Sequence, residues 1–417
     1  MMTGRCRRSG FVAAMVAALV LLVGGVARAQ DTIKLGISIA MTGPASYVGI
    51  GAQRGAEIAI DEINARGGVR GKKLELVIRD DEHNPVKTVA QTRELVERER
   101  VVAMLGASNS ASMLAVAPIV NDQLKVPIVC PATDATAITE NAAWKEGREN
   151  YLFRMGMYGR AQSNFLVNNA VQKFGYRKPA LLTWTAGWGV TGRAELNRRL
   201  GELTLKPVAD ETYDSADTDI TPPLLKIRAA GADAILNYGL VRENVVVVRS
   251  KEKLGDKTPY FSAWGLSPHA FARAAGPLSE GVLVSTTVTS DGPQSAERTE
   301  FLKKYAQRYG PEMESVTTTF AAYDIVRLYA QVIEKVGTDP KAIRAGLENV
   351  PYFRGLIKEF KRPVFTREKH DALHEDDYIL ARWTDGKLLE VQWDGDRPYV
   401  MVDGTKRYFD KATSVLR

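Results

Sequence analysis

Few residues of this sequence are spaced for catalysis or for metal binding. His370 and His374 stand four residues apart, ahead of three consecutive acidic residues, and zinc uses that spacing only on a helix. This segment precedes a predicted strand, so no metal site is predicted there. Gly49, Gly51 and Gly55 come near a dinucleotide-binding fingerprint, but the third glycine is one residue late. No nucleophile–base pair is found either, so we predict a protein that is not an enzyme and that holds no metal and no cofactor.

The length and composition favour a globular chain of two or three domains. The 417 residues are 45% hydrophobic and 25% charged, which excludes a disordered chain and a polytopic membrane protein. Four of the 56 basic residues lie in the first 29 residues, which hold no acid, so the rest has 52 basic against 49 acidic residues. Because the net charge of +7 is concentrated at the start of the chain, no nucleic-acid partner is predicted.

The first 29 residues have the pattern of a signal peptide. Arginines precede an uncharged apolar run at residues 11–23, and Ala27-Arg28-Ala29 then fits the small-x-small rule for cleavage. The run is shorter than the ~20 residues that span a bilayer, which disfavours the alternative of an uncleaved anchor. We predict a signal peptide at residues 1–29 and a mature periplasmic chain that starts at Gln30. Its one cysteine, Cys130, ends an apolar run and is expected to be a small buried residue rather than a nucleophile.

Strand and helix patterns alternate along the mature chain. The first half predicts strands at residues 33–40, 74–78, 101–105 and 126–130, with helices at 52–63, 85–97 and 111–123 between them. Such an order implies a parallel sheet with helices on both faces. A second set predicts strands at 180–184, 205–213, 234–238 and 259–262, and helices at 190–202, 221–230 and 244–254. Three late helices at 297–309, 316–336 and 340–347 and a β tail at 378–408 are expected to complete the two lobes.

The fold class itself predicts where a ligand binds. In open parallel sheets, ligands lie outside the carboxyl ends of the strands. The loops there are rich in small, hydroxyl and aromatic residues and poor in acid–base groups, and they span residues 41–48, 106–112, 131–136, 185–189, 238–242 and 262–265. This composition suits a small molecule that is held by hydrogen bonds and stacking.

Several segments of the chain resemble the periplasmic leucine/isoleucine/valine-binding proteins. They are Met41-Thr42-Gly43-Pro44, the Asp-x-x-Asn and Gly-Gly-x-x-Gly motifs at residues 61–71, Arg79-Asp80-Asp81 and Ala322-Tyr323-Asp324. The resemblance implies the α/β type I periplasmic binding fold, with two Rossmann-like lobes of parallel sheets joined by a three-strand hinge. It places the crossovers near residues 151–154, 281–284 and 363–365. The implied N-terminal lobe is 30–152 plus 285–362, and the C-terminal lobe is 153–284 plus 363–417.

The resemblance also implies site residues. The loop after the third strand matches at Ser110, with Ala111 behind it, where a hydroxyl and backbone N–H groups would bind the ligand's carboxylate. The sequence supports this role independently, because Ser110 is predicted at the N-terminus of a helix, where backbone N–H groups favour an anion. The alternative is that Ser110 is only the cap of that helix. The next loop matches at Ala132 and Asp134, and an aromatic of the second lobe matches at Trp188.

Two positions depart from the family pattern. Asp134 replaces a threonine, and Trp264 replaces the glutamate that binds the ligand's ammonium. Asp134 could supply that counter-charge from the other lobe, and the tryptophans could form an aromatic cleft with Tyr47 nearby. Arg160 is a further candidate for a carboxylate.

The resemblance therefore implies a solute-binding protein of an ABC importer. It would capture a branched-chain amino acid or similar small carboxylate and deliver it to a membrane permease, as a monomer. An aromatic acid or aliphatic amide remains an alternative ligand. A ligand sensor and an exported enzyme are the alternative classes, but the acid–base residues of an enzyme were not found.

Overall fold

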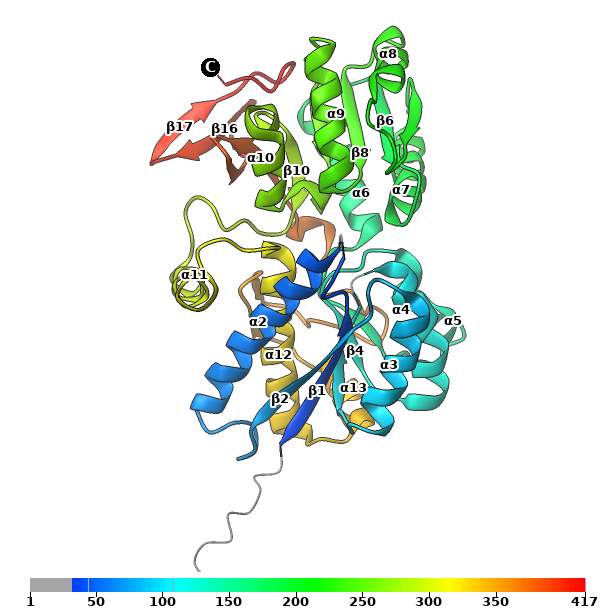
Figure 1. The fold of residues 1–417 in the computed structure, drawn as a ribbon, viewed down its shortest axis with the longest axis vertical. Helices are drawn as coiled ribbons and strands as arrows, with labels where there is room; N and C mark the ends of the chain where they lie inside the picture. The colour runs from blue at the N-terminus through cyan, green and yellow to red at the C-terminus, as the bar shows by residue number, and fades with distance from the viewer. Residues whose placement is uncertain (1–31, 44, 108, 417) are drawn as a thin grey trace, which may run out of the picture.

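The computed structural model describes residues 32–416 except residues 44 and 108, so the predicted signal peptide lies outside the described residues. Two lobes lie one above the other along the longest axis (Figure 1). No helix among the described residues is long and apolar enough to cross a membrane.

The first lobe is built on a five-stranded parallel sheet in the order β2-β1-β3-β4-β5. Its strands are β1 (Ile33–Ile39), β2 (Leu74–Asp80), β3 (Ala103–Leu105), β4 (Ile128–Cys130) and β5 (Leu152–Arg154). The helices are α2 (Ser46–Ala65), α3 (Pro85–Glu97), α4 (Ser110–Ile119) and α5 (Ala142–Lys145), and later α11 (Ala296–Tyr309), α12 (Val316–Val336) and α13 (Pro340–Leu347). The prediction that the late helices return to complete the lobes is confirmed here, because α12 packs beside α2 in one core (Figure 1).

The motif at residues 61–71 has a local structural role. The Asn64 side chain donates to the Leu74 carbonyl at 2.9 Å and accepts from the Leu74 amide at 2.7 Å. It thereby ties the end of α2 to the start of β2. Gly68, at φ +78°, makes the turn between them, and an added Cβ would lie 2.0 Å from the Lys72 carbonyl oxygen.

The second lobe is built on a mixed sheet of seven strands. Its order is β14-β13-β10-β9-β8-β6-β7, with strands β6 (Pro179–Trp184), β7 (Asp210–Tyr213), β8 (Ala234–Tyr238), β9 (Tyr260–Ser262), β10 (Leu283–Thr286), β13 (Ile379–Thr384) and β14 (Lys387–Glu390). Its helices are α6 (Gly159–Asn168), α7 (Trp188–Glu202), α8 (Thr221–Ala229), α9 (Val241–Lys253) and α10 (His269–Ala275). The expected parallel order holds for β6 to β10, but β13 and β14 run antiparallel. The tight turn at Asp385-Gly386, with both residues at positive φ, joins β13 to β14 as a hairpin, whereas β13 pairs antiparallel with β10 after the third crossing.

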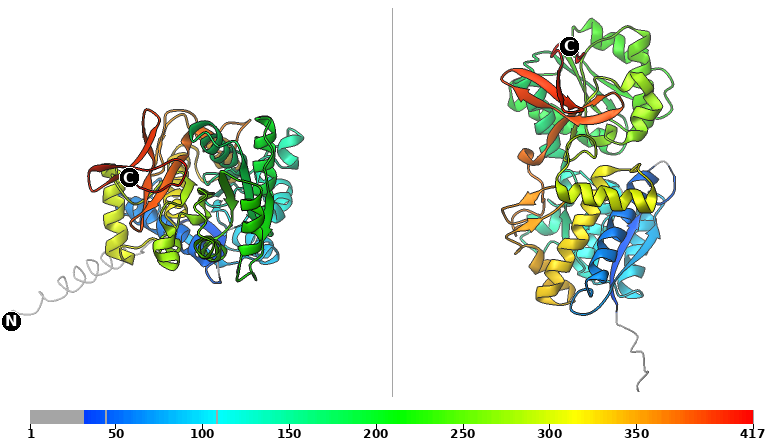
Figure 2. Two further views of the ribbon diagram at one scale, coloured as in Figure 1. Left: turned by 90° about the horizontal axis from the view of Figure 1, so that it is seen from above. Right: turned by 90° about the vertical axis from the view of Figure 1, so that its left-hand side faces the viewer.

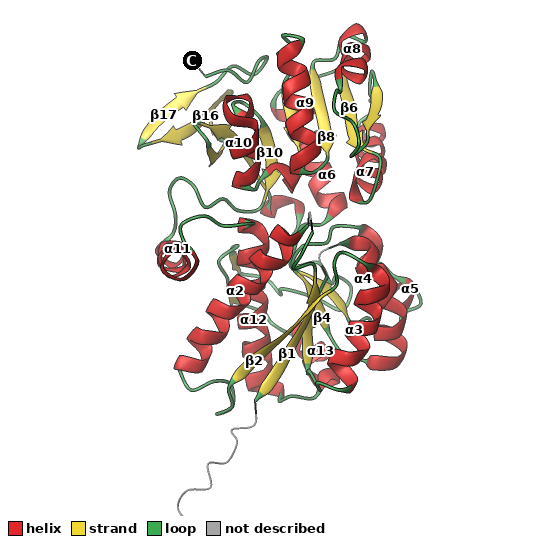
Figure 3. Cartoon of the chain, in the orientation of Figure 1, coloured by secondary structure: helices red, strands yellow, loops and turns green. Residues whose placement is uncertain are grey.

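The C-terminal tail forms a separate three-stranded sheet. Its strands are β15 (Gln392–Asp394), β16 (Arg397–Val402) and β17 (Thr405–Tyr408), and a small pair, β11 (Phe353–Arg354) and β12 (Glu359–Phe360), lies earlier in the chain. Val400, Val402 and Phe409 pack into the core of the second lobe. Figures 2 and 3 show the tail lying beside this lobe.

The chain crosses between the lobes three times, after β5, after β10 and before β13. The third crossing lies later than the expected residues 363–365. Val364 and Phe365 are buried in the core of the first lobe, and the His370 carbonyl still accepts from the Arg154 amide of β5 at 2.8 Å. The chain therefore leaves the first lobe between Leu373 and Ile379.

Helix α6 was not predicted from the sequence. Its first residues are small or polar, it has no side-chain cap, and its buried positions include Gln162 and Ser163. No start signal therefore marks this helix, and it is buried against α7 and β10 of its own lobe, with Leu166 and Val167 in that lobe's core.

The approach of α12 to α2 depends on glycine. A Cβ on Gly55 would lie 2.0 Å from the backbone oxygen of Thr319, so one of the two helix backbones would have to move to admit it. We expect Gly55→Ala to lower the free energy of unfolding by about 1–3 kcal/mol in denaturant titrations. Gly201→Ala in α7 is the control, since its Cβ would meet nothing within 4 Å, and it should be neutral or stabilising. Equal stabilities for the Gly55→Ala variant and the parent would contradict this packing.

Candidate functional site

A small cavity lies between the lobes. It is bounded by the ends of β4 and β9, by the first crossing and by the first turn of α12. The lining residues are Pro131, Ala132, Asp134, Met157, Trp264, Thr317 and Thr318. The cavity thus occupies the predicted position beyond the carboxyl ends of the strands.

Asp134 is the one charged residue in this lining. It is 5% exposed, and burial raises the pKa of its carboxyl to about 7, with Glu195 adding to the rise and Arg154 opposing it. The carboxylate bonds its own backbone N–H, and no other described side chain donates to it. A buried carboxylate without a counter-charge is a strong candidate to bind a cationic or hydrogen-bond-donating group.

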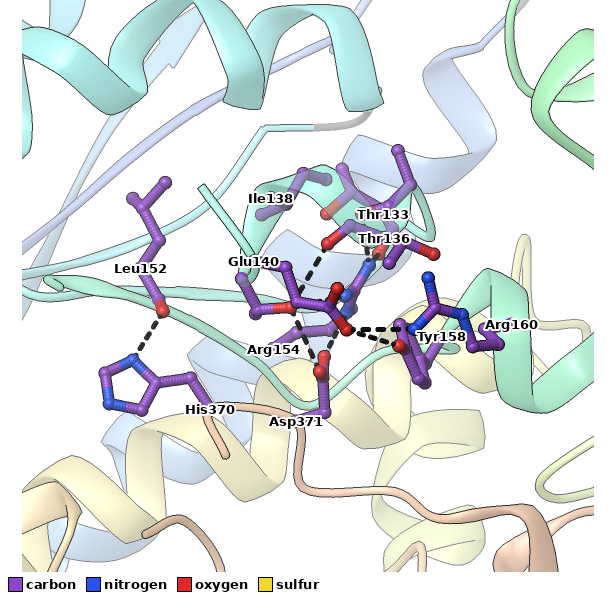
Figure 4. Close-up of polar contacts among 12 residues, drawn as sticks. Thr133, Thr136, Ile138, Glu140, Leu152, Arg154, Tyr158, Arg160, His370 and Asp371 are labelled. Carbon is purple, nitrogen blue, oxygen red and sulfur yellow. Dashed lines mark hydrogen bonds and ion pairs between the residues drawn. The ribbon is translucent and has the colours of Figure 1, made fainter. Parts of the chain in front are cut away.

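The loop that carries Asp134 is held by a buried guanidinium (Figure 4). Arg154 is fully buried, and its Nε pairs with Asp371 Oδ1 at 2.6 Å. One terminal nitrogen donates to the carbonyls of Thr133 and Ala135 at 3.2 and 2.9 Å, and the other donates to Thr139 Oγ1 at 2.9 Å. Arg154 is therefore fully engaged in shaping the loop, which leaves Asp134 as the uncompensated charge.

Aromatic rings close the cavity from the second lobe. Trp264 is 7% exposed and packs within the core of the first lobe, although it follows β9 of the second. Its ring lies 5.8 Å from that of Trp188, which in turn meets Tyr238 edge-on at 5.0 Å. Gly265 and Gly192 allow this stacking, because a Cβ on Gly265 would meet the Trp188 ring at 3.0 Å and one on Gly192 would meet the Tyr238 ring at 2.2 Å.

Ser110 lies beside the cavity loop but outside the lining. It is the first residue of α4, and the helix cap is Asn109, whose side chain accepts from the Ser112 amide at 2.7 Å. The alternative that Ser110 is the cap is therefore wrong. Its Oγ accepts from the Ala135 amide at 3.2 Å, which leaves its own hydrogen free to donate. Ala111 follows in the first turn of α4 with an exposed side chain.

Arg160 pairs with Glu140 across the junction of the lobes (Figure 4) and is not among the residues that line the cavity. Its guanidinium lies 3.3 Å from Glu140 of the first lobe and 3.6 Å from Glu195 of the second. Thr136 Oγ1 donates to Glu195 at 3.2 Å, and Tyr158 donates to Glu140 at 2.9 Å. With two acidic partners, Arg160 is poorly placed to bind a ligand carboxylate.

Tyr47 also lies at the junction of the lobes. It is partly buried on α2, where burial raises the pKa of its phenol and Glu243 of α9 adds to the rise. Tyr47, Trp188, Arg160, Ser110 and Ala111 do not line the cavity, and their contact with a ligand stays a prediction.

Comparison with known proteins identifies the family. The family described as "Periplasmic binding protein" matches residues 32–387. The chain belongs to this periplasmic binding protein family. A relative named Leu/Ile/Val-binding protein homolog 1, from Brucella suis, is 25% identical over 379 residues, which cover 90% of this chain and 97% of the relative.

Solved structures of periplasmic binding proteins share the fold. A type 1 protein from Bordetella pertussis is 25% identical with a TM-score of 0.75, and the match covers 86% of this chain and 99% of that one. A branched-chain amino acid transporter substrate-binding protein from Streptococcus pneumoniae, in complex with isoleucine, is 24% identical with a TM-score of 0.74 over 86% and 98%. A solute-binding protein from Rhodopseudomonas palustris, in complex with 4-hydroxybenzoate, is 22% identical with a TM-score of 0.74 over 87% and 97%. The two-lobed type I periplasmic binding fold is therefore confirmed.

Sequence reasoning missed four of the residues that line the cavity of this periplasmic binding protein. Pro131 lies within the loop at residues 131–136, which was predicted to bind a ligand, so its position in the chain could have identified it. Met157 follows a predicted crossover, and Thr317 and Thr318 begin a helix about 180 residues after that loop. No local pattern marks such residues, because only the return of α12 to the first lobe brings them to the site.

Cys130 and His370, which have reactive side chains, are buried within the fold and do not line the cavity. Cys130 is fully buried, as predicted, and burial raises the pKa of its thiol to about 12. His370 is buried, with its ring nitrogens 2.9 Å from the Leu152 carbonyl and from Glu348. Within the described part of this periplasmic binding protein, no three His, Cys, Asp or Glu residues are placed to hold a metal.

We expect Asp371→Asn to lower the free energy of unfolding by about 3–5 kcal/mol, because it leaves the Arg154 charge buried without its partner. Asp385→Asn is the matched control, since the Asp385–Arg407 pair at 2.9 Å is exposed and should contribute less than about 1 kcal/mol. Chemical denaturation of both variants measures the difference, and similar small losses would show that the buried pair does not support the loop.

Proposed function

We propose that this periplasmic binding protein is the solute-binding component of an ABC importer. It captures a branched-chain amino acid or a similar small carboxylate between its lobes and delivers it to a membrane permease. The chain is exported through a signal peptide cleaved before Gln30 and acts in the periplasm as a monomer, without catalysis. The lobe boundaries follow the three crossings, which lie after β5, after β10 and between Leu373 and Ile379.

The observation that carries this proposal is the cavity between the lobes with Asp134 buried in it. A rigid body on each side of the cavity and three crossings behind it allow the lobes to open and close on a ligand. The similar relatives and structures bear names of leucine/isoleucine/valine binding and branched-chain amino acid transport, which supports an amino acid as the ligand.

The charges around the cavity favour a zwitterion. Asp134 supplies the counter-charge for an α-ammonium group, in place of the family's glutamate at the position of Trp264. The free hydroxyl hydrogen of Ser110 and the start of α4 lie one loop away and are suited to the carboxylate. Trp264 then covers the remaining apolar part of the ligand.

An aromatic acid is the second candidate, favoured by the Trp188–Trp264 stack at 5.8 Å. A structurally similar protein that binds 4-hydroxybenzoate supports it as well. A carboxylate without an amine would, however, face Asp134 with no free cation in the lining, since Arg154 and Arg160 are both engaged.

A thermal-shift screen of the mature protein against amino acids, aliphatic amides and aromatic acids tests the proposal. We expect the melting temperature to rise with amino acids and not with benzoates. A response to none of these compounds at millimolar concentration would refute the proposed ligand class.

Asp134→Asn should weaken amino-acid binding by roughly a hundred- to a thousandfold, because the ammonium would lose its only buried counter-charge. Isothermal titration calorimetry with the best amino acid from the screen measures the loss. The control is Asp324→Asn, a second buried aspartate whose pKa is also raised to about 7 by burial but which bonds the amides of Leu356 and Ile357. It should lose stability and keep its affinity. Unchanged affinity in Asp134→Asn would exclude the counter-charge role.

Amino-acid affinity should also depend on pH. Burial raises the pKa of Asp134 to about 7, so the ionised form that binds ammonium is lost as the pH falls below that value. We expect affinity to fall by up to about tenfold per unit between pH 7 and pH 5. The unliganded protein should behave in the opposite way. A carboxyl whose folded pKa is raised costs stability most above pH 7, and that cost shrinks as the pH falls toward its unfolded pKa. Asp134→Asn should therefore stabilise the unliganded protein more at pH 8 than at pH 5.

A further inference from the structure

The first turn of α12 is buried although its backbone donors have no partner among the residues that the structure describes. The first bond of the helix runs from the Thr319 amide to the Ser315 carbonyl at 3.1 Å, so the amides of residues 316–318 precede it. Ser315 makes no side-chain capping bond, and the first turn contains no acid. Among the described residues none accepts from these three amides, yet Val316, Thr317 and Thr318 are only 5%, 4% and 1% exposed.

A buried helix start normally obtains its partners from caps, water or a ligand. One side of this turn is closed by α2, since a Cβ on Gly51 would lie 2.6 Å from Thr318 Oγ1. The other side is open, because Thr317 and Thr318 line the cavity. An acceptor for the orphan donors therefore has to come from within the cavity.

A second observation at the same cavity points to a ligand. Asp134 lines it from the opposite loop, is 95% buried and receives no hydrogen bond from another described side chain. The cavity thus pairs a buried carboxylate with a group of buried donors. An occupant that satisfies both carries a donor or cation at one end and an acceptor at the other.

We infer that the first turn of α12, with the Thr317 hydroxyl, binds a hydrogen-bond acceptor on the ligand's side chain. The inference rests on the proposed function, with the ammonium at Asp134 and the α-carboxylate toward α4. It narrows the ligand to a small amino acid with an oxygen on a short side chain, threonine or serine being the simplest. The Trp264 ring, only 7% exposed in the same lining, limits the length of that side chain.

A ligand with an aliphatic side chain would leave these donors without an acceptor. It would cover the three amides without offering an acceptor, and unpaired buried donors are costly. The Thr317 hydroxyl would keep only its 3.4 Å contact with the Ser315 hydroxyl. Sites built around hydrogen bonds reject analogues that lack the bonding group far more strongly than apolar sites reject an added methyl group.

Threonine and valine have nearly the same shape and differ by the hydroxyl, so their affinities for the mature protein, measured by calorimetry, test the inference directly. We expect threonine to bind at least tenfold more tightly than valine. Thr317→Val should reduce that ratio to less than about threefold, whereas Thr317→Ser, which retains a hydroxyl, should preserve it.

Thr319→Val is the matched control, because the Thr319 hydroxyl is equally buried on the same helix but donates to the Ser315 carbonyl at 2.6 Å and does not line the cavity. It should keep the threonine preference. Equal or tighter binding of valine by the parent protein would overturn this inference and leave the proposed function intact. Failure of both amino acids to bind would count against the proposed amino-acid ligand and against this inference with it.

Discussion

The buried ion pair between Arg154 and Asp371 is the constraint on which the arrangement of the site depends. A guanidinium with no exposed surface is stable only when its donors are matched, and here they reach one carboxylate, two carbonyls and one hydroxyl. Arg154 ends β5, Asp371 lies on the segment that leads to the third crossing, and both carbonyls belong to the cavity loop. One residue thus couples the shape of the binding loop to two of the three connections between the lobes.

This coupling explains the unusual charge of the cavity. Because Arg154 is engaged by Asp371 and the loop carbonyls, its charge only partly offsets the desolvation of Asp134, whose pKa burial raises to about 7. A carboxylate of this kind is destabilising when the site is empty and the group is ionised, and a bound cationic group would remove that cost. Binding energy and loop geometry are therefore linked through the same guanidinium.

The two lobes are held together around the cavity by polar contacts as well as by aromatic packing. Glu140 and Glu195 share Arg160 across the junction, and the Gly159 amide donates to the Asp134 carbonyl at 2.7 Å. Trp264 extends from the second lobe into the core of the first. Most of these contacts join residues of different lobes, so a motion that separates the lobes would have to break them together.

The sequence by itself determined the parts of this protein that depend on local periodicity and on short motifs. The alternation of strands and helices predicted the two-lobed α/β fold, and the helices at residues 85–97 and 316–336 were predicted to the residue. The loops that hold Asp134 and Trp264 were predicted from the strand ends, where parallel sheets bind ligands. The two residues themselves were identified by the resemblance to the leucine/isoleucine/valine-binding proteins. Helix α6 and the third crossing were missed or misplaced, because burial against distant segments, and not a local sequence signal, fixes them.

Only the tertiary structure decided which candidates share a cavity. From the sequence, Arg160 was a candidate to bind a ligand carboxylate, but in the fold Glu140 and Glu195, from different lobes, already pair with it. Thr317 is an ordinary helical residue in the sequence, but the return of α12 across the first sheet places it in the lining with Asp134. Burial and pairing arise from contacts between residues far apart in the chain, so no single segment of the sequence contains them.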